Sequence, residues 1–296
     1  MSNNEFLSFH VIMAVQLRSA PPNIGGNRMP EGLQIIKVVL PTDVKNIEII
    51  PIGDGHLGES ECDISLLRDV VEYVRAEPNR YAIINGDMIN NAIKTAVSDV
   101  YGENDPEDEI RKVANLLFPI KEKILAMGSG NHEERTLKLT GIDPSRYISV
   151  RLGIEDRYAS NSFLLFLKMG LSHTSKNSNR DKQLVYKIFV QHGYGGGKKN
   201  GSKLNNLNAS DGIVADADLY IMGHTHTPIL NAMSTFLCDV QNMQAYRHTK
   251  YYMMHNAYMD FGGYGLRFGF SPAAKEVTYA ILNGQGRKKI KMVMGL

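Results

Sequence analysis

The chain has 296 residues, of which 43% are hydrophobic and 22% charged, and its formal net charge is +2 with histidine neutral. These values are typical of a soluble globular protein and exclude a chain too short to bury a sizeable core. The small net charge does not by itself call for a nucleic-acid partner. No apolar run reaches the roughly 20 residues that a membrane helix requires, so we expect no membrane partner.

Residues 1–45 are interpreted as an N-terminal extension packed on a main domain that spans residues 46–296. Residues 9–17 and 33–40 are apolar enough to form two strands, which can pair as a hairpin. The loop between them is rich in proline, glycine and asparagine, the residues that favour turns. This segment carries no residue to which we can assign chemistry.

In the next part of the chain, predicted strands and helices alternate. Apolar runs predict strands at 47–52, 81–84 and 123–127. A helical pattern capped by Asp63 follows the first strand. A second helical pattern follows Pro106 and begins with acidic residues, which the helix dipole favours at that end. This alternation predicts a parallel sheet with right-handed crossovers.

The second half of the chain predicts a more antiparallel sheet that packs on the first. Residues 163–167 and 184–190 form apolar runs typical of neighbouring strands, and 219–222 is a further strand. A short helix is expected over 202–208. Later strands are predicted at 235–239, 252–256, 277–282 and 290–293.

Residues that commonly bind metals follow five of the predicted strands. The segments are Asp54-Gly55-His56, Gly86-Asp87, Gly130-Asn131-His132, His192-Gly193 and Gly223-His224-Thr225-His226. Because the carboxyl ends of strands in an α/β sheet open on one side, these segments can converge on one crevice. Their mixture of nitrogen and oxygen donors suits divalent transition metals. We therefore infer a hydrolytic centre with two metal ions.

Each segment taken alone also has a structural explanation. Asp54 and His56 can belong to an ordinary turn, and His192 can be a half-buried core histidine. Asn131 can cap the following helix instead of binding a metal, because one side-chain oxygen prefers one role. Asp87 is able to bridge two cations, but it can equally be a plain residue at a strand end. The Gly-His-Thr-His segment is the most specific, since two imidazoles at i and i+2 can reach two adjacent metals.

In this order the segments resemble the motifs of the calcineurin-like metallophosphoesterase family. The resemblance covers about residues 47–230, and Glu133 stands where many members have Asp. It implies an α/β fold of four layers, in which a two-sheet β-sandwich is flanked by helices, and a single metallophosphoesterase domain over 46–296. It also implies two divalent ions of Mn, Fe or Zn. The implied roles are Asp54, His56 and His226 at the first metal, Asn131, His192 and His224 at the second, Asp87 as the bridge and His132 as the catalytic histidine.

Such a centre is expected to hydrolyse phosphoesters with a hydroxide that bridges the two metals. We favour a phosphodiesterase or nuclease acting on DNA, RNA or nucleotides. A phosphomonoesterase, including a protein phosphatase, ranks lower because Arg135 is the only arginine beside a motif. A non-catalytic scaffold is the third alternative, although such family members have typically lost ligands that this chain keeps. The glycine-rich loop 195–203, with its three lysines including Lys203, can hold a polyanion near the metals or can be a solvated flexible loop. Lys198, Lys199 and Arg135 are the candidate substrate-binding residues.

The aromatic C-terminal part and the cellular location are less constrained by the sequence. Aromatic residues between 251 and 270 can pack in the core or form a platform on which bases stack. The first residues lack the basic and apolar segments of a signal peptide. Two cysteines are too few for a disulfide framework, so we expect a cytoplasmic location.

Overall fold

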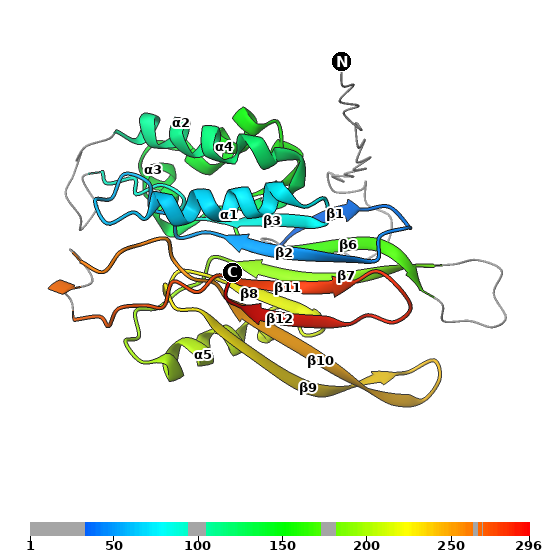
Figure 1. Cartoon of the computed structure of the whole chain (residues 1–296). Helices are drawn as coiled ribbons and strands as arrows, with labels where there is room; N and C mark the ends of the chain where they lie inside the picture. Colours follow the sequence, from blue (N-terminus) through cyan, green and yellow to red (C-terminus); the bar gives the residue numbers. More distant parts are fainter. Residues whose placement is uncertain (1–32, 94–104, 173–181, 263–265, 268) are drawn as a thin grey trace, which may run out of the picture.

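The computed structural model describes residues 33–93, 105–172, 182–262, 266–267 and 269–296. Two six-stranded sheets lie face to face, with most helices over one sheet and a single helix of the described residues, α5, beside the other (Figure 1). The expected strand at 9–17 and the loop after it lie outside the described residues. The four layers agree with the fold that the family resemblance implies.

The first sheet has the order β12-β11-β2-β3-β4-β5. Within this sheet, β2, β3, β4 and β5 are parallel to one another, as the alternation of strands and helices predicts. β11 and β12 pair antiparallel beside β2. The prediction that these last two strands join the second sheet is therefore wrong. The strands are β2 (Asn46–Ile52), β3 (Arg80–Asn85), β4 (Ile124–Gly128), β5 (Tyr158–Ala159), β11 (Thr278–Asn283) and β12 (Ile290–Met294).

Four α-helices cover the outer face of the first sheet. The Asp63 carboxylate accepts a hydrogen bond from the Leu66 N–H and caps α1, as predicted. α2 begins at Pro106, also as predicted, and Asp105 caps it. These helices are α1 (Ile64–Ala76), α2 (Pro106–Leu117), α3 (Asn131–Thr140) and α4 (Pro144–Leu152), with short 3₁₀ turns η1 (Phe118–Lys123) and η2 (Glu155–Arg157).

The second sheet has the order β1-β6-β7-β8-β10-β9 and mixes parallel and antiparallel pairs. β1 pairs parallel with β6, so this part of the expected extension is a strand of the sheet itself. α5 (Asn200–Asn208) and the short turn η3 (Ala209–Gly212) lie on the outer face. The strands are β1 (Gln34–Val39), β6 (Phe163–Ser172), β7 (Lys182–Gln191), β8 (Leu219–Met222), β9 (Ile229–Asp239) and β10 (Gln244–Met254).

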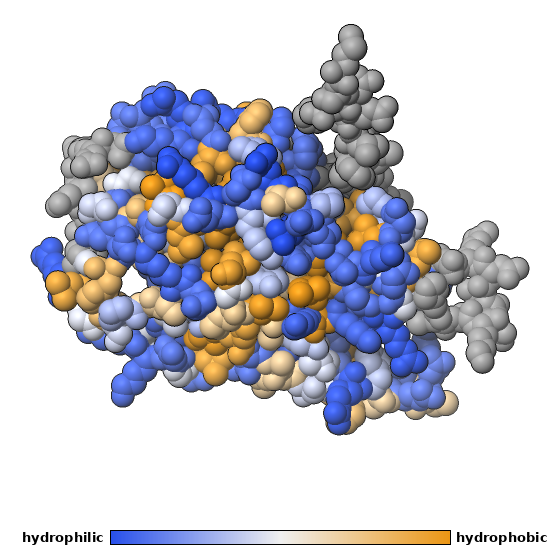
Figure 2. Space-filling view, viewed as in Figure 1, coloured by the Kyte–Doolittle hydropathy of each residue, from blue (hydrophilic) through white to orange (hydrophobic). Residues whose placement is uncertain are grey.

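Three apolar layers hold these elements together. The largest lies between the sheets, where Ile49 and Ile83 of the first meet Leu165 and Ile188 of the second. Other clusters fill the space between the first sheet and its helices, and between the second sheet and α5. Figure 2 shows hydrophilic residues over most of the helices and hydrophobic ones toward the middle of this face. No helix of the described residues is long and apolar enough to cross a membrane.

Candidate metal centre

The structure brings the eight predicted centre residues together at one end of the two sheets. Asp54, Asp87 and Asn131 follow β2, β3 and β4 of the first sheet, while His192 and His224 follow β7 and β8 of the second. Because parallel strands place their carboxyl ends at the same edge, both sheets contribute to one crevice. The remaining three residues, His56, His132 and His226, lie in the same segments.

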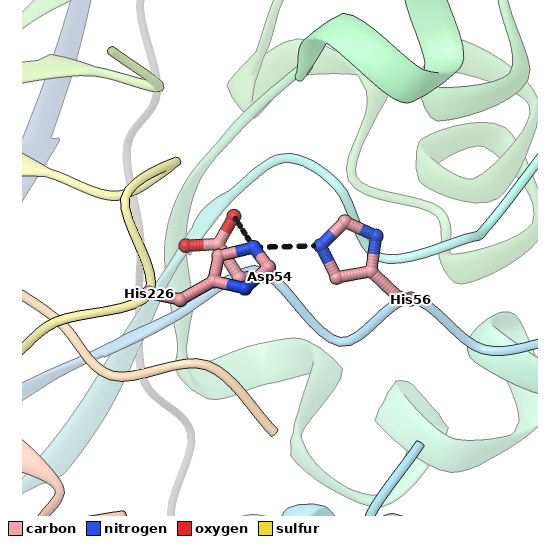
Figure 3. A group of neighbouring side chains, drawn as sticks. All are labelled: Asp54, His56 and His226. Carbon is pink, nitrogen blue, oxygen red and sulfur yellow. Dashed lines mark hydrogen bonds and ion pairs between the residues drawn. The ribbon is translucent and has the colours of Figure 1, made fainter. Parts of the chain in front are cut away.

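One group of donors consists of Asp54, His56 and His226. Their donor atoms all lie within 4.8 Å of one another. The Nε2 atoms of the two histidines are 3.0 Å apart, and His226 Nε2 is 3.8 Å from Asp54 Oδ1. Figure 3 shows the two imidazoles and the carboxylate turned toward one another from two separate loops. A cation placed among them would contact two nitrogens and one oxygen.

A second group consists of Asp87, His192, His224 and Asn131. The first three have donor atoms within 4.8 Å of one another. Asn131 Oδ1 lies 2.8 Å from His224 Nδ1 and 3.1 Å from His192 Nε2. Asn131 is the first residue of α3 and Gly130 is its cap, so the asparagine side chain faces the other donors instead of capping the helix.

Asp87 lies between the two groups. Its Oδ2 is 3.1 Å from His192 Nε2 and 3.8 Å from His132 Nε2. Its other oxygen, Oδ1, accepts a hydrogen bond of 2.8 Å from the His132 N–H. Asp87 also groups with His56 and His132 within the same 4.8 Å limit. Asp87 therefore lies within reach of donors from both groups.

The donor set fits divalent metal ions. Asp54 Oδ1 is fully buried and has no hydrogen-bond partner in the described part of the chain. An orphaned buried carboxylate oxygen is costly unless a cation or a donor meets it. Imidazole nitrogens together with carboxylate and amide oxygens are the ligands of Zn, Fe and Mn sites. These residues can therefore hold a metal.

The backbone is strained where the candidate ligands lie. Among the described non-glycine residues, seven have positive φ, and five of them are candidate ligands. Positive φ is unfavourable for residues with a Cβ atom and persists only where surrounding structure enforces it, often at functional sites. The five are Asp54 (52°), His56 (44°), Asp87 (49°), His224 (67°) and His226 (55°).

Burial controls the charge state of these residues. It raises the pKa of Asp54 to about 8, and it lowers the pKa of His226 to about 3. Burial also opposes the charged form of His192, but the Asp87 carboxylate beside it raises the pKa of this histidine to about 10. Neutral imidazoles such as His226 are ready to donate a lone pair to a cation.

The Glu133 side chain fixes the loop that carries Asp87 through hydrogen bonds. Its buried carboxylate accepts hydrogen bonds from the N–H groups of Asp87 (2.9 Å), Met88 (2.8 Å) and Gly130 (3.0 Å). These contacts fix the turn that presents Asp87 and the start of the helix that presents Asn131. Sequence reasoning identified Glu133 only as a variation on a family motif. Its role could have been found from its place three residues after the helix cap, a typical position for such a glutamate.

Asn85 and His255 connect the two sheets next to the candidate ligands. The sequence motifs did not include these two residues. Asn85 Nδ2 donates to Gln191 O (3.1 Å) and lies 3.2 Å from His255 Nε2. The His192 Nδ1–H donates to Asn85 O at 2.8 Å, which leaves Nε2 of His192 facing the centre. Such a partner fixes the tautomer and ring orientation of a ligand histidine. The available signal was that His255 also follows an apolar run.

His132 is oriented in the same way. Its Nδ1–H donates to Asn90 O at 2.7 Å, so Nε2 faces the cavity beside Asp87. Burial lowers the pKa of His132. Arg135, one turn along α3, donates to the same carbonyl at 3.2 Å and also lines the cavity.

The cavity over the donors has a volume of about 570 Å³. Arg135 and the glycines 195–197 line it, whereas Lys198 and Lys199 do not. Lys198 Nζ lies 5.8 Å from the centre of the Phe270 ring, and Lys199 precedes α5 as its cap residue. The lysine of this segment that reaches the cavity is Lys203. Phe261, Phe270 and Pro272 form part of an apolar wall.

The fold places these donors as one candidate metal centre at the end of both sheets. The family model described as calcineurin-like phosphoesterase matches residues 47–228, which is more than half of the chain. The chain therefore belongs to the calcineurin-like phosphoesterases, in agreement with the resemblance of its motifs. A search of the curated proteins finds no significant match.

Several solved structures are distantly similar. A conserved uncharacterized protein of Streptococcus pneumoniae, a predicted phosphoesterase, is 13% identical with a TM-score of 0.33, over 84% of this chain and 90% of that one. A putative 5′-nucleotidase from Staphylococcus aureus is 12% identical with a TM-score of 0.42, over 84% and 54%. A calcineurin-like phosphoesterase from Bacillus subtilis is 12% identical with a TM-score of 0.39, over 85% and 91%. At these values the family assignment rests on the family model.

Proposed function

We propose that the chain is a phosphodiesterase that works with two divalent metal ions and a hydroxide held between them. The position of Asp87 carries this proposal. Its carboxylate lies within reach of both donor groups, and each group offers three donors of its own when Asn131 is counted with His192 and His224. One carboxylate with two oxygens can join two cations, whereas a mononuclear site would leave one donor group without a role.

When bound, such a metal pair lowers the pKa of a water toward neutrality and offsets the negative charge on the phosphoryl oxygens. The chain's own residues supply the remaining steps. Asp54, Asp87, Asn131 and the imidazoles of His56, His192, His224 and His226 would hold the metals beside the cavity. The strained but fixed backbone of these residues provides a preorganised site.

His132 is the residue that we assign to the leaving group. Its Nε2 faces the cavity and can hold a proton that passes to the departing alkoxide. The Asp87 carboxylate and the Asn90 carbonyl both favour the protonated form, while burial opposes it. Burial outweighs both and lowers the pKa of His132, so the protonated imidazole gives up its proton readily when it forms. General acid catalysis of this kind contributes roughly 10²–10⁴-fold.

The shape and lining of the cavity support a diester as substrate. A diester carries an alcohol on each side of the phosphorus, so it needs room beyond the metal centre. The cavity of about 570 Å³ has an apolar wall that includes Met259, Phe261 and Phe270. Aromatic side chains can stack on a nucleobase. We therefore propose nucleotides or single-stranded nucleic acid as the substrates, ahead of phosphomonoesters and phosphoproteins.

A panel of two synthetic esters tests the proposal. The full chain loaded with Mn²⁺ should hydrolyse bis-p-nitrophenyl phosphate faster than p-nitrophenyl phosphate. The reverse preference would support a phosphomonoesterase, and no turnover of either ester by metal-loaded protein would support a scaffold. Binding to single-stranded DNA should weaken as salt rises, because phosphate contacts release counterions. A flat response would contradict the nucleic-acid part of the proposal.

A further inference from the structure

Lys203 sends its side chain from α5 into the cavity over the metal centre. The residue is only 8% exposed, although lysine is rarely buried. Its ammonium donates to the Thr225 carbonyl at 3.1 Å and to the Thr227 hydroxyl. Thr225 lies between the candidate ligands His224 and His226 in the chain. The ammonium therefore stands directly beside the segment that carries two of the donors.

In the described part of the chain, the charge of Lys203 has no counter-ion. Lys250, which is buried to the same extent, forms an ion pair with Asp211 at 2.9 Å. Within the described ranges, no carboxylate lies within 4.0 Å of the Lys203 ammonium, and both of its acceptors are uncharged. Burying an unpaired charge is costly. A fold that keeps such a cation at a cavity is suited to an anion that arrives from outside.

An ammonium has three N–H donors, and two of them are used by threonine oxygens. The third donor and the unpaired charge remain for a ligand in the cavity. A compact ammonium binds phosphate oxygens well as a point charge. The threonine contacts fix the position of this charge, so little entropy is lost when an anion binds.

We propose that Lys203 binds an anionic, non-bridging oxygen of the substrate's phosphoryl group. This assignment rests on the proposed phosphoester chemistry, and it gives to Lys203 alone a role that the sequence suggested for the three lysines of residues 195–203. Lys203 is a substrate-binding residue in this account and takes no part in proton transfer.

The test uses the full metal-loaded chain and inorganic phosphate as the probe. Calorimetry measures phosphate binding by the wild type, Lys203→Met, Lys203→Gln and the control Lys199→Met. The methionine variant keeps the apolar stem, and the glutamine variant keeps a neutral hydrogen-bond donor for the threonines. We expect phosphate affinity to fall about 10–100-fold in both Lys203 variants, as for the loss of a charged hydrogen bond. The control should bind like the wild type, and all four proteins should retain their metal.

Two results would overturn the assignment. One is unchanged phosphate affinity in Lys203→Met. The other is wild-type affinity in Lys203→Gln together with metal loss in Lys203→Met, which would show that Lys203 only braces the His224–His226 segment. Failure of the proposed function is seen separately. A wild type that binds phosphate through Lys203 but hydrolyses neither synthetic ester would refute the enzyme activity and leave the anion site standing.

Discussion

His56 and His226 face each other with their Nε2 atoms 3.0 Å apart, although 170 residues separate them in the chain. Burial lowers the pKa of both imidazoles, so each is neutral near pH 7. Two neutral rings brought together in this way share either one proton or one cation. The buried Asp54 Oδ1 beside them has no hydrogen-bond partner among the described residues, which favours the cation.

Replacement of His132 by alanine should slow turnover without loss of metal. The imidazole is placed to give a proton to the leaving group, so we expect kcat on a diester to fall by about 10²–10⁴-fold. Elemental analysis should still find two metals per chain, because the seven other donors remain. His248→Ala on β10 is the control and should keep wild-type rates. Full activity in His132→Ala would contradict the catalytic role.

Asp87→Asn should weaken metal binding in both donor groups. The amide keeps the size of the side chain but loses its charge and one of the two oxygen donors that a bridge needs. We expect metal content below that of the wild type at equal free metal, with both ions affected. Asp239→Asn, at the exposed end of β9, is the matched control. Unchanged stoichiometry in Asp87→Asn would rule out the bridge.

Gly86→Ala should destabilise the protein strongly. Gly86 has a φ of +77°, and a Cβ atom there would lie 2.3 Å from the backbone nitrogen of Gly130. The positive φ alone costs about 1–2 kcal/mol, and the clash adds to it. Gly141→Ala is a matched control, since its φ is +74° but nothing lies within 4 Å of the added atom. Urea unfolding of the two variants should show a larger loss for Gly86. If both variants lost the same free energy of unfolding, the close contact with Gly130 would not contribute to the destabilisation.

Glu109 should make stability depend on pH. Burial raises its pKa from 4.5 to about 7, while its carboxylate accepts a hydrogen bond from the Asn91 N–H. Between these two values the folded state holds a proton that the unfolded chain has released, so the free energy of unfolding falls as pH rises through this window. The loss amounts to about 3 kcal/mol between pH 4 and pH 8.

The Glu109→Gln variant carries no titrating group at this position. Its free energy of unfolding, compared with that of the wild type in urea at pH 4 and pH 8, should lack this loss. The variant is therefore expected to be the more stable protein at pH 8. If the free energies of unfolding of the two proteins changed with pH in the same way, the pKa of Glu109 would not be raised in the folded state.

Local patterns in the sequence predicted most of the strands, and the candidate ligands lie close together as expected. β8 begins and ends at the predicted residues, and the donors follow their strands as expected. This success has a physical reason, because a buried parallel strand reads as a short apolar run and its end must carry the chemistry. Local sequence could not decide whether Asn131 caps the helix or faces the metal centre. The structure decides it, because Gly130 is the cap residue and the Asn131 side chain is available to the other donors.

Long-range pairing and the second layer of the site could not be predicted. The sequence of β11 does not indicate that it returns to the edge of β2 instead of joining the second sheet. His255 and Asn85 act through contacts across 170 residues, which no local pattern reveals. Of the three lysines in residues 198–203, only Lys203, which lies in α5, lines the cavity.

Anomalous X-ray scattering from crystals soaked in Mn²⁺ tests the central claim most directly. The account predicts two anomalous peaks about 3.5–4 Å apart, one beside Asp54, His56 and His226, the other beside Asn131, His192 and His224, with Asp87 contacting both. A single peak, or no peak among these side chains at saturating Mn²⁺, would contradict it.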